Sequence, residues 1–229
     1  MPVTALLDPD ALEAAVRAQT ASGATSVRFD YLGASTYVAK GWSAISIGAY
    51  VEGERALRRA IELAPDDKEA GALLGWSLMG QDRLGEAMAP LREVLAADPE
   101  YSLARVSVGY VQYRLGHFGD AIEHLAAVAR GADDRKAVLY AHYWLGLVYQ
   151  RREMHEDALG YFRQALALGP NLLQAYYEMG RVLWRMGDRD AALNAWRAGA
   201  AANKFNAWGK RCDEVRTAVE QGGEPPPLD

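Results

Sequence analysis

Residues 139–172 read LYAHYWLGLVYQRREMHEDALGYFRQALALGPNL, and this stretch sets the pattern for most of the chain. Three of its positions, Gly146, Ala158 and Phe162, have counterparts at fixed offsets elsewhere. The glycine recurs as Gly41, Gly75, Gly109, Gly146 and Gly180, at spacings of 34, 34, 37 and 34 residues. The same spacings separate the small residues Gly53, Ala87, Ala121, Ala158 and Ala192, and the bulky residues Leu57, Leu91, Leu125, Phe162 and Trp196. Because three tracks share one period and one three-residue insertion, the chain is built from an internal repeat.

Each repeat is predicted to be a pair of antiparallel helices. In the quoted stretch, apolar residues follow a helical period over a first helix at 137–151 and a second at 156–167. Gly146 and Ala158 lie where the two helices would cross, and a larger side chain there would push the helix axes apart. Phe162 is expected to fill the space beside the crossing. Pro170 follows the second helix and ends it, because proline lacks the N–H and fixes φ.

This order of small, bulky and proline positions, at a period of 34 residues, resembles the tetratricopeptide repeat. The resemblance covers residues 34–206 in five units, at 34–67, 68–101, 102–135, 139–172 and 173–206. It implies an all-α fold, a right-handed solenoid of about five helix-turn-helix units with terminal capping helices. For function it is much less specific, because the same fold serves many partners.

The segment before the repeats, 1–33, is predicted to hold a capping helix and an extended linker. Asp8-Pro9 has the form of an N-cap followed by proline at the first helical position, which favours a helix over 9–20. In 24–33 the residues Val27, Phe29 and Tyr31 alternate with charged ones, the period of an extended segment. This segment is interpreted as a linker anchored on unit one. The alternative is that it lies in a groove, of its own chain or of a neighbour, as a built-in ligand.

The segment after the repeats is predicted to be a second capping helix at 207–221. Trp208, Cys212, Val215 and Val219 share one helical face, so Cys212 is interpreted as a small buried apolar residue. Residues 222–229 contain three consecutive prolines and are expected to be disordered or extended.

The three inserted residues fall within 131–137. A longer first helix in unit four is favoured over a longer loop, because 136–149 is continuously compatible with a helix. In either case the superhelix should be irregular between units three and four.

The composition of the chain limits the compartments in which the protein is expected and the class of partner that it is expected to bind. The 229 residues are 50% hydrophobic and carry a formal net charge of −5, which argues against a nucleic-acid-binding surface. The single cysteine, Cys212, excludes an internal disulfide and a cysteine-based metal site. No apolar run is long enough to span a membrane, and residues 1–7 lack the basic residues of a secretory signal. A cytoplasmic location is therefore expected, unless a leader was removed before residue 1.

The family resemblance implies that the first helix of each unit lines a concave groove. Its groove-facing positions give a surface rich in aromatic residues and arginine, the residue types that dominate binding hot spots. The candidate peptide-binding residues are Trp42, Trp76, Tyr110, Tyr113, Arg114, Tyr140, Tyr143, Trp144, Arg151, Tyr177, Arg181, Trp184 and Arg185. The arginines predict a locally positive C-terminal half, suited to an apolar peptide or amphipathic helix that carries carboxylates. The alternative for each aromatic residue is packing between neighbouring helices.

No catalytic or metal-binding pattern is present in the sequence. His155-Glu156 lacks the second histidine four residues on that a helical zinc site needs, and no cofactor is expected. The sequence thus predicts a non-catalytic scaffold or adaptor that binds a protein or peptide. The alternative is a self-assembling structural protein, a homo-oligomer that uses the groove or the end caps.

Overall fold

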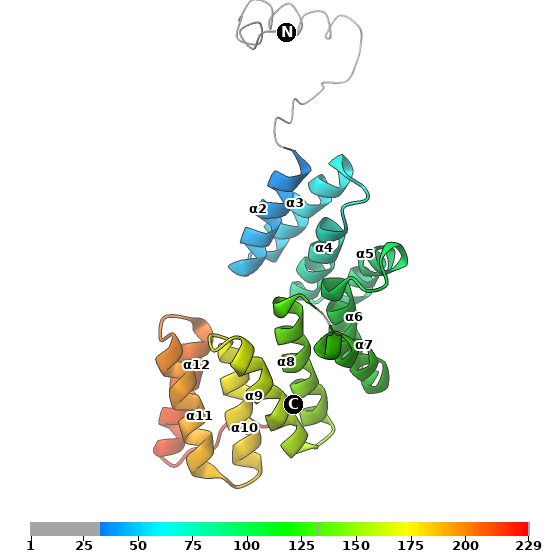
Figure 1. Cartoon of the computed structure of the whole chain (residues 1–229). Helices are drawn as coiled ribbons and strands as arrows, with labels where there is room; N and C mark the ends of the chain where they lie inside the picture. The colour runs from blue at the N-terminus through cyan, green and yellow to red at the C-terminus, as the bar shows by residue number, and fades with distance from the viewer. Residues whose placement is uncertain (1–32, 132, 229) are drawn as a thin grey trace, which may run out of the picture.

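The protein is described by a computed structural model that covers residues 33–131 and 133–228. Within these residues it has eleven helices and no strand, stacked as a right-handed solenoid (Figure 1). The first helices of the five units, here called A helices, are α2 (Ala34–Ser46), α4 (Lys68–Gly80), α6 (Ser102–Arg114), α8 (Arg135–Arg151) and α10 (Leu173–Arg185). The second, or B, helices are α3 (Tyr50–Leu63), α5 (Leu84–Ala97), α7 (Phe118–Gly131), α9 (His155–Leu168) and α11 (Arg189–Ala202). The capping helix predicted at 9–20 and the linker predicted up to residue 32 lie outside the described residues.

The A and B helices of each unit cross where the repeating glycine meets the repeating bulky residue. A Cβ atom added to Gly146 would lie 2.5 Å from the ring of Phe162. Gly41, Gly75 and Gly109 stand in the same relation to a leucine, at 2.5 to 2.6 Å, and Gly180 to Trp196. Each crossing therefore depends on the absence of a side chain on the A helix, as the sequence pattern predicts.

The turns between A and B helices add a fourth repeating track that the sequence analysis did not find. One residue in each turn has a left-handed backbone, with φ values of 58° to 88°: Gly48, Asp82, Gly116, Glu153 and Gly187. Three units meet this requirement with glycine, which adopts the conformation without steric cost. Units two and four use Asp82 and Glu153, which are strained there.

The three-residue insertion lengthens α8, as predicted. This helix has 17 residues, whereas each of the other A helices has 13. The connection before it, 132–134, is one residue shorter than those before α4, α6 and α10. Asp134 caps the new N-terminus by accepting hydrogen bonds from the N–H groups of Lys136 and Ala137 at 2.9 and 3.1 Å. The insertion thus adds one helical turn on the concave side.

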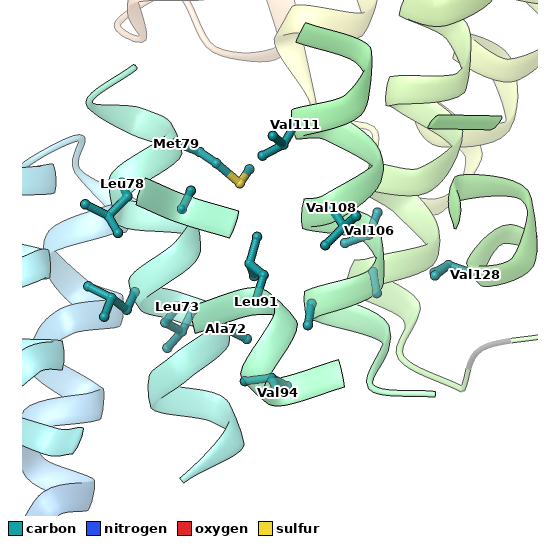
Figure 2. Packing of buried hydrophobic residues seen from close by; sticks show 14 of the residues in the cluster. Ala72, Leu73, Leu78, Met79, Leu91, Val94, Val106, Val108, Val111 and Val128 are labelled. Carbon is teal, nitrogen blue, oxygen red and sulfur yellow. The ribbon is translucent and has the colours of Figure 1, made fainter. Parts of the chain in front are cut away.

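The buried core consists of two clusters that meet within unit four. One cluster of buried apolar residues runs from unit one to α8, and the other runs from α9 to α12. Figure 2 shows part of the first, where Met79 and Leu91 of unit two face Val106 and Val111 of unit three. The two clusters meet at α8 and α9, where Tyr143 and Leu147 of α8 pack against the second cluster and Phe162 lies against Gly146.

The C-terminal end of the solenoid is closed by α12 (Ala207–Glu220), close to the predicted 207–221. Its buried face includes Cys212, Val215 and Val219, and burial raises the pKa of the Cys212 thiol to about 12. After α12 the chain turns at Gly222, whose φ is 90°, and residues 223–228 continue without helix or strand. Glu224–Leu228 border the same hollow as Gln150 and Arg151 at the C-terminal end of α8, and Figure 1 shows the last described residues running toward this end of the helix.

Candidate functional site

The A helices surround a concave groove with a volume of ≈ 630 Å³. Ten of the thirteen candidate residues line it: Trp42, Trp76, Tyr110, Tyr113, Arg114, Tyr140, Tyr143, Trp144, Arg151 and Arg181. Trp184 and Arg185 instead border a second hollow of ≈ 450 Å³, which Arg151 and Arg181 share. Tyr177 borders a third hollow, between α10 and α12. The structure therefore brings the candidates onto one side of the solenoid but divides them among three adjoining hollows.

Four of the aromatic side chains form one cluster across three A helices. The Trp76 ring meets the Tyr140 ring edge-on, with centroids 4.8 Å apart, and the Tyr110 and Trp144 rings lie 4.7 Å apart. Trp76 also contacts Trp144, at 5.7 Å. Within this aromatic cluster, Trp144 is only 6% exposed. It and Tyr177, also 6% exposed, are mainly core residues, so the alternative of packing between helices holds for both.

Three tyrosines of the groove, Tyr113, Tyr140 and Tyr143, remain neutral at ordinary pH. Burial raises the pKa of Tyr113, Tyr140 and Tyr143, and the effect is largest for Tyr143. Neutral phenols keep a hydroxyl proton that can be donated to a ligand.

The positive charge of the groove is smaller than the sequence indicates. Arg114 pairs with Asp82 at 2.6 Å and Arg181 pairs with Glu178 at 2.9 Å, so carboxylates of the protein neutralise two of the four arginines. Arg151 and Arg185 are exposed and form no ion pair within residues 33–131 and 133–228. The sequence could not show this difference, because Asp82 lies in a turn outside the groove positions. The uncompensated charge is thus concentrated at the C-terminal ends of α8 and α10.

A buried polar group lies between the first two hollows. Glu178 accepts hydrogen bonds from Gln150 Nε2 at 3.0 Å and from Arg181 Nη1 at 2.9 Å. Because an ionised carboxylate only accepts hydrogen bonds, the amide nitrogen of Gln150 must be the atom that faces it. The other amide atom, Gln150 Oε1, is buried and has no hydrogen-bond partner in the described part of the chain. It is an acceptor at the edge of both hollows without a donor.

The sequence does not predict that the C-terminal segment of the chain forms part of the site. The second hollow is bordered on one side by α8 and α10 and on the other by the C-terminal residues Glu224 to Leu228. Trp184 Nε1 donates a hydrogen bond of 2.9 Å to Glu224 Oε2, and Arg181 Nε donates one of 3.4 Å to the carbonyl oxygen of Pro226. The terminal segment is therefore extended, one of the two expected states, and it lies against the groove. No pattern in residues 222–229 points to this contact.

The described residues contain neither a candidate metal site nor a helix that could span a membrane. No group of three or more His, Cys, Asp or Glu side chains there could hold a metal ion. No helix between residues 33 and 228, residue 132 aside, is long and apolar enough to cross a membrane.

The sequence of this chain matches models of a known protein family. Three models described as tetratricopeptide repeat match residues 38–102, 139–172 and 173–199. The chain is a tetratricopeptide repeat protein. The match at 139–172 has the bounds that the sequence pattern assigns to unit four. Proteins of this family bind protein partners.

Individual relatives resemble the chain over part of its length. The photosystem I assembly protein Ycf3 of Acaryochloris marina is 34% identical over 86 residues, which are 38% of this chain and 47% of that protein. The match thus spans about half the length of the Ycf3 protein.

Solved structures show the same fold over most of the chain. TTC0263, a thermophilic tetratricopeptide repeat protein of Thermus thermophilus, has a TM-score of 0.71 and 19% identity, over 82% of this chain and 100% of its own. PilF of Pseudomonas aeruginosa has a TM-score of 0.62 and 21% identity, over 82% of this chain and 86% of its own. At such identities the likeness shows the fold alone.

Proposed function

We propose that this tetratricopeptide repeat protein is a non-catalytic scaffold that binds a segment of a protein partner in its concave groove. The observation that carries the proposal is the groove itself, ≈ 630 Å³ in volume and lined by aromatic side chains from four A helices. Large, rigid aromatic side chains give much contact area with little loss of conformational entropy on binding. The groove leads toward Arg151 and Arg185, which have no carboxylate partner in the described residues.

The chemistry of the groove favours a partner segment with apolar residues and a carboxylate. Apolar residues would cover the exposed parts of Trp42, Trp76 and Tyr110, and a carboxylate would pair with Arg151 or Arg185. The name of the Ycf3 relative, an assembly protein, supports a role in bringing other proteins together. The family relationship supports the same class of function.

The proposal can be tested with random peptides displayed on phage and selected on the full-length protein. We expect the selected peptides to combine apolar residues with Asp or Glu, and to lose binding on an Arg151→Glu/Arg185→Glu variant. Both arginines are exposed, so this variant should fold normally.

A matched control carries the same charge change on the other side of the solenoid. Arg92 in α5 and Arg163 in α9 are exposed residues of B helices, so an Arg92→Glu/Arg163→Glu variant should keep the selected peptides. Equal loss of binding in both variants, or no selectable peptide, contradicts a groove function. Self-assembly, the competing interpretation, would instead appear as a mass that rises with concentration in sedimentation experiments.

A further inference from the structure

The chain returns on itself after α12 because of two glycines. The N–H groups of Gly222 and Gly223 donate hydrogen bonds to the carbonyl oxygens of Val219 and Ala218, at 3.0 and 2.9 Å, and close the helix end. Gly222 has a φ of 90°, which residues other than glycine rarely adopt. This reversal sends the next residues back across α12 toward α10, and not away from the solenoid (Figure 1).

The returning segment, Glu224–Leu228, is held at three points. Trp184 Nε1 donates to the Glu224 carboxylate at 2.9 Å. Arg181 Nε donates to the Pro226 carbonyl at 3.4 Å. Leu228 packs against the C-terminal core cluster. The contacts use one carboxylate, one backbone carbonyl and one apolar side chain, which are the features of a bound peptide.

The composition of this segment matches the surface on which it lies. Residues 225–227 are prolines, which have no N–H to donate and favour an extended backbone whose carbonyls point outward. The surface offers donors: the Trp184 indole, the Arg181 guanidinium and the Arg185 guanidinium at the edge of the same hollow. An extended chain that only accepts hydrogen bonds and carries a negative charge therefore suits this end of the groove.

The C-terminal segment does not contact every polar group at the edge of the second hollow. Gln150 Oε1 lies at the edge of the hollow and is a buried acceptor without a partner in the described residues. Three prolines cannot supply the missing donor, whereas a partner segment with a residue other than proline at one of these positions has an N–H that could. The exposed Arg151 and a hollow of ≈ 450 Å³ also remain beside the segment. The C-terminal segment thus behaves as a partial ligand that another chain can replace.

We infer that Glu224–Leu228 is a tethered ligand that occupies the C-terminal end of the groove, and that the partner recognised there is an extended, proline-rich segment with a carboxylate before its prolines. This inference rests on the proposed function, since it names the class of segment that the groove takes. Binding of the partner displaces the protein's own C-terminal segment. The tether weakens the partner's apparent affinity, because the two compete for the same donors.

The test uses a fluorescein-labelled peptide with the sequence of residues 222–229, GGEPPPLD, titrated by fluorescence anisotropy. One binding protein is the full chain, and the other ends at Gly223, which keeps the hydrogen bonds that close α12. A short tether gives an effective concentration on the order of 1 mM, so a peptide with a Kd of about 100 μM should bind the full chain about tenfold more weakly than the shortened one. A peptide of the same composition in scrambled order, PDGPLGPE, should bind neither protein.

The contact to Glu224 is tested separately. A peptide with Glu224→Gln should bind the shortened chain several-fold more weakly than GGEPPPLD. In a Trp184→Phe variant of the shortened chain, which keeps an aromatic ring but loses the donor, the two peptides should bind about equally. A difference that persists in this variant overturns the assignment of the carboxylate to Trp184.

The outcome also separates this inference from the proposed function. If GGEPPPLD does not bind the shortened chain, or binds both chains equally, the tethered-ligand inference is wrong. Phage-selected peptides that still depend on Arg151 and Arg185 would then leave the groove function standing. If neither kind of peptide binds, both proposals fail together.

Discussion

The ammonium group of Lys136 lies 3.8 Å from the centre of the Trp42 ring, although one belongs to α8 and the other to α2. Lys136 is in the extra turn that the three-residue insertion adds to α8. An A helix of the usual length would begin after this position and leave Trp42 without the cation. The insertion therefore connects the first unit to the fourth across the concave side.

Removing the charge of Lys136 should weaken this connection. We expect Lys136→Gln to lower the free energy of unfolding by about 0.5–1 kcal/mol, the usual range of an exposed cation–π contact, and Lys136→Arg to change it little. Urea unfolding followed by tryptophan fluorescence would measure both. Equal losses in the two variants would show that the charge over Trp42 contributes nothing.

Replacing Glu153 by glycine should stabilise the protein. Glu153 has a φ of 58° in the turn of unit four, where units one, three and five have glycine. Glu153→Gly removes a strain of about 1 kcal/mol, partly offset by the greater freedom of glycine in the unfolded chain. We expect a net gain of about 0.5 kcal/mol in thermal or urea unfolding, and a loss for the reverse change, Gly187→Glu. A loss from Glu153→Gly would contradict this account of the turn.

The crossing at Gly146 should be the most sensitive position of unit four. An added Cβ would lie 2.5 Å from Phe162, so Gly146→Ala should cost about 2–3 kcal/mol and Gly146→Leu more. Arg151→Ala, on an exposed residue, should change stability by less than about 0.5 kcal/mol. Thermal melts of the three variants give the comparison.

A second substitution tests whether Phe162 is the cause. Gly146→Ala combined with Phe162→Leu should lose less than the two single changes added together, because the smaller side chain makes room for the methyl group. If the loss of stability in the double variant equals the sum of the losses in the two single variants, the added methyl group does not clash with Phe162.

The buried pair of Glu178 and Arg181 should be costly to break but not essential. The two residues are 8% and 7% exposed, and their closest atoms are 2.9 Å apart. Arg181→Met leaves a buried carboxylate with one donor, Gln150, and should cost about 3–5 kcal/mol. Adding Glu178→Leu should recover much of the loss, since an apolar pair avoids the burial of charge. A double variant as unstable as the single one would argue against this explanation.

Two histidines should make the protein less stable in mild acid. Burial lowers the pKa of His124 and His142 below the ordinary value of 6.5. The unfolded chain therefore takes up protons before the folded one does, and stability falls as pH drops below 6.5. The carboxyl groups of Glu54, Glu86 and Asp98 also have lowered pKa values, but their ordinary values of 4.5, 4.5 and 3.8 confine that loss to lower pH.

Thermal melts between about pH 7.5 and 5.5 would measure the histidine effect. A His124→Gln/His142→Gln variant should show a flatter dependence than the natural chain. If stability depends on pH equally steeply in this variant, groups other than His124 and His142 cause the dependence.

The sequence alone predicts the fold in considerable detail because each unit is defined by local pattern. Gly146, Ala158 and Phe162 mark a crossing, and the same three positions recur in every unit, so an error in one unit is corrected by the others. The length of α8 also follows from the sequence, since residues 136–149 are continuously helical in character. Contacts that recur in every unit can therefore be predicted from the sequence.

The candidate site is less predictable because it depends on the curvature of the whole solenoid. The pairing of Arg114 with Asp82 joins a groove position to a turn of the preceding unit. The contact of Lys136 with Trp42 bridges units that are not adjacent, and Glu224 reaches Trp184 only because Gly222 reverses the chain. None of these pairings recurs from one unit to the next, so no periodic pattern in the sequence indicates them.

The aromatic cluster also determines how the solenoid should unfold. In an ideal repeat array each unit contacts only its neighbours, so unfolding can start at either end and spread unit by unit. Here Trp76 of unit two touches Tyr140 and Trp144 of unit four, and Lys136 extends the link to unit one. Units one to four, from α2 to α9, thus form a closed loop of contacts and not a linear series. We expect these four units to melt as one cooperative block, while α10 to α12 keep the stepwise unfolding of an ordinary repeat array.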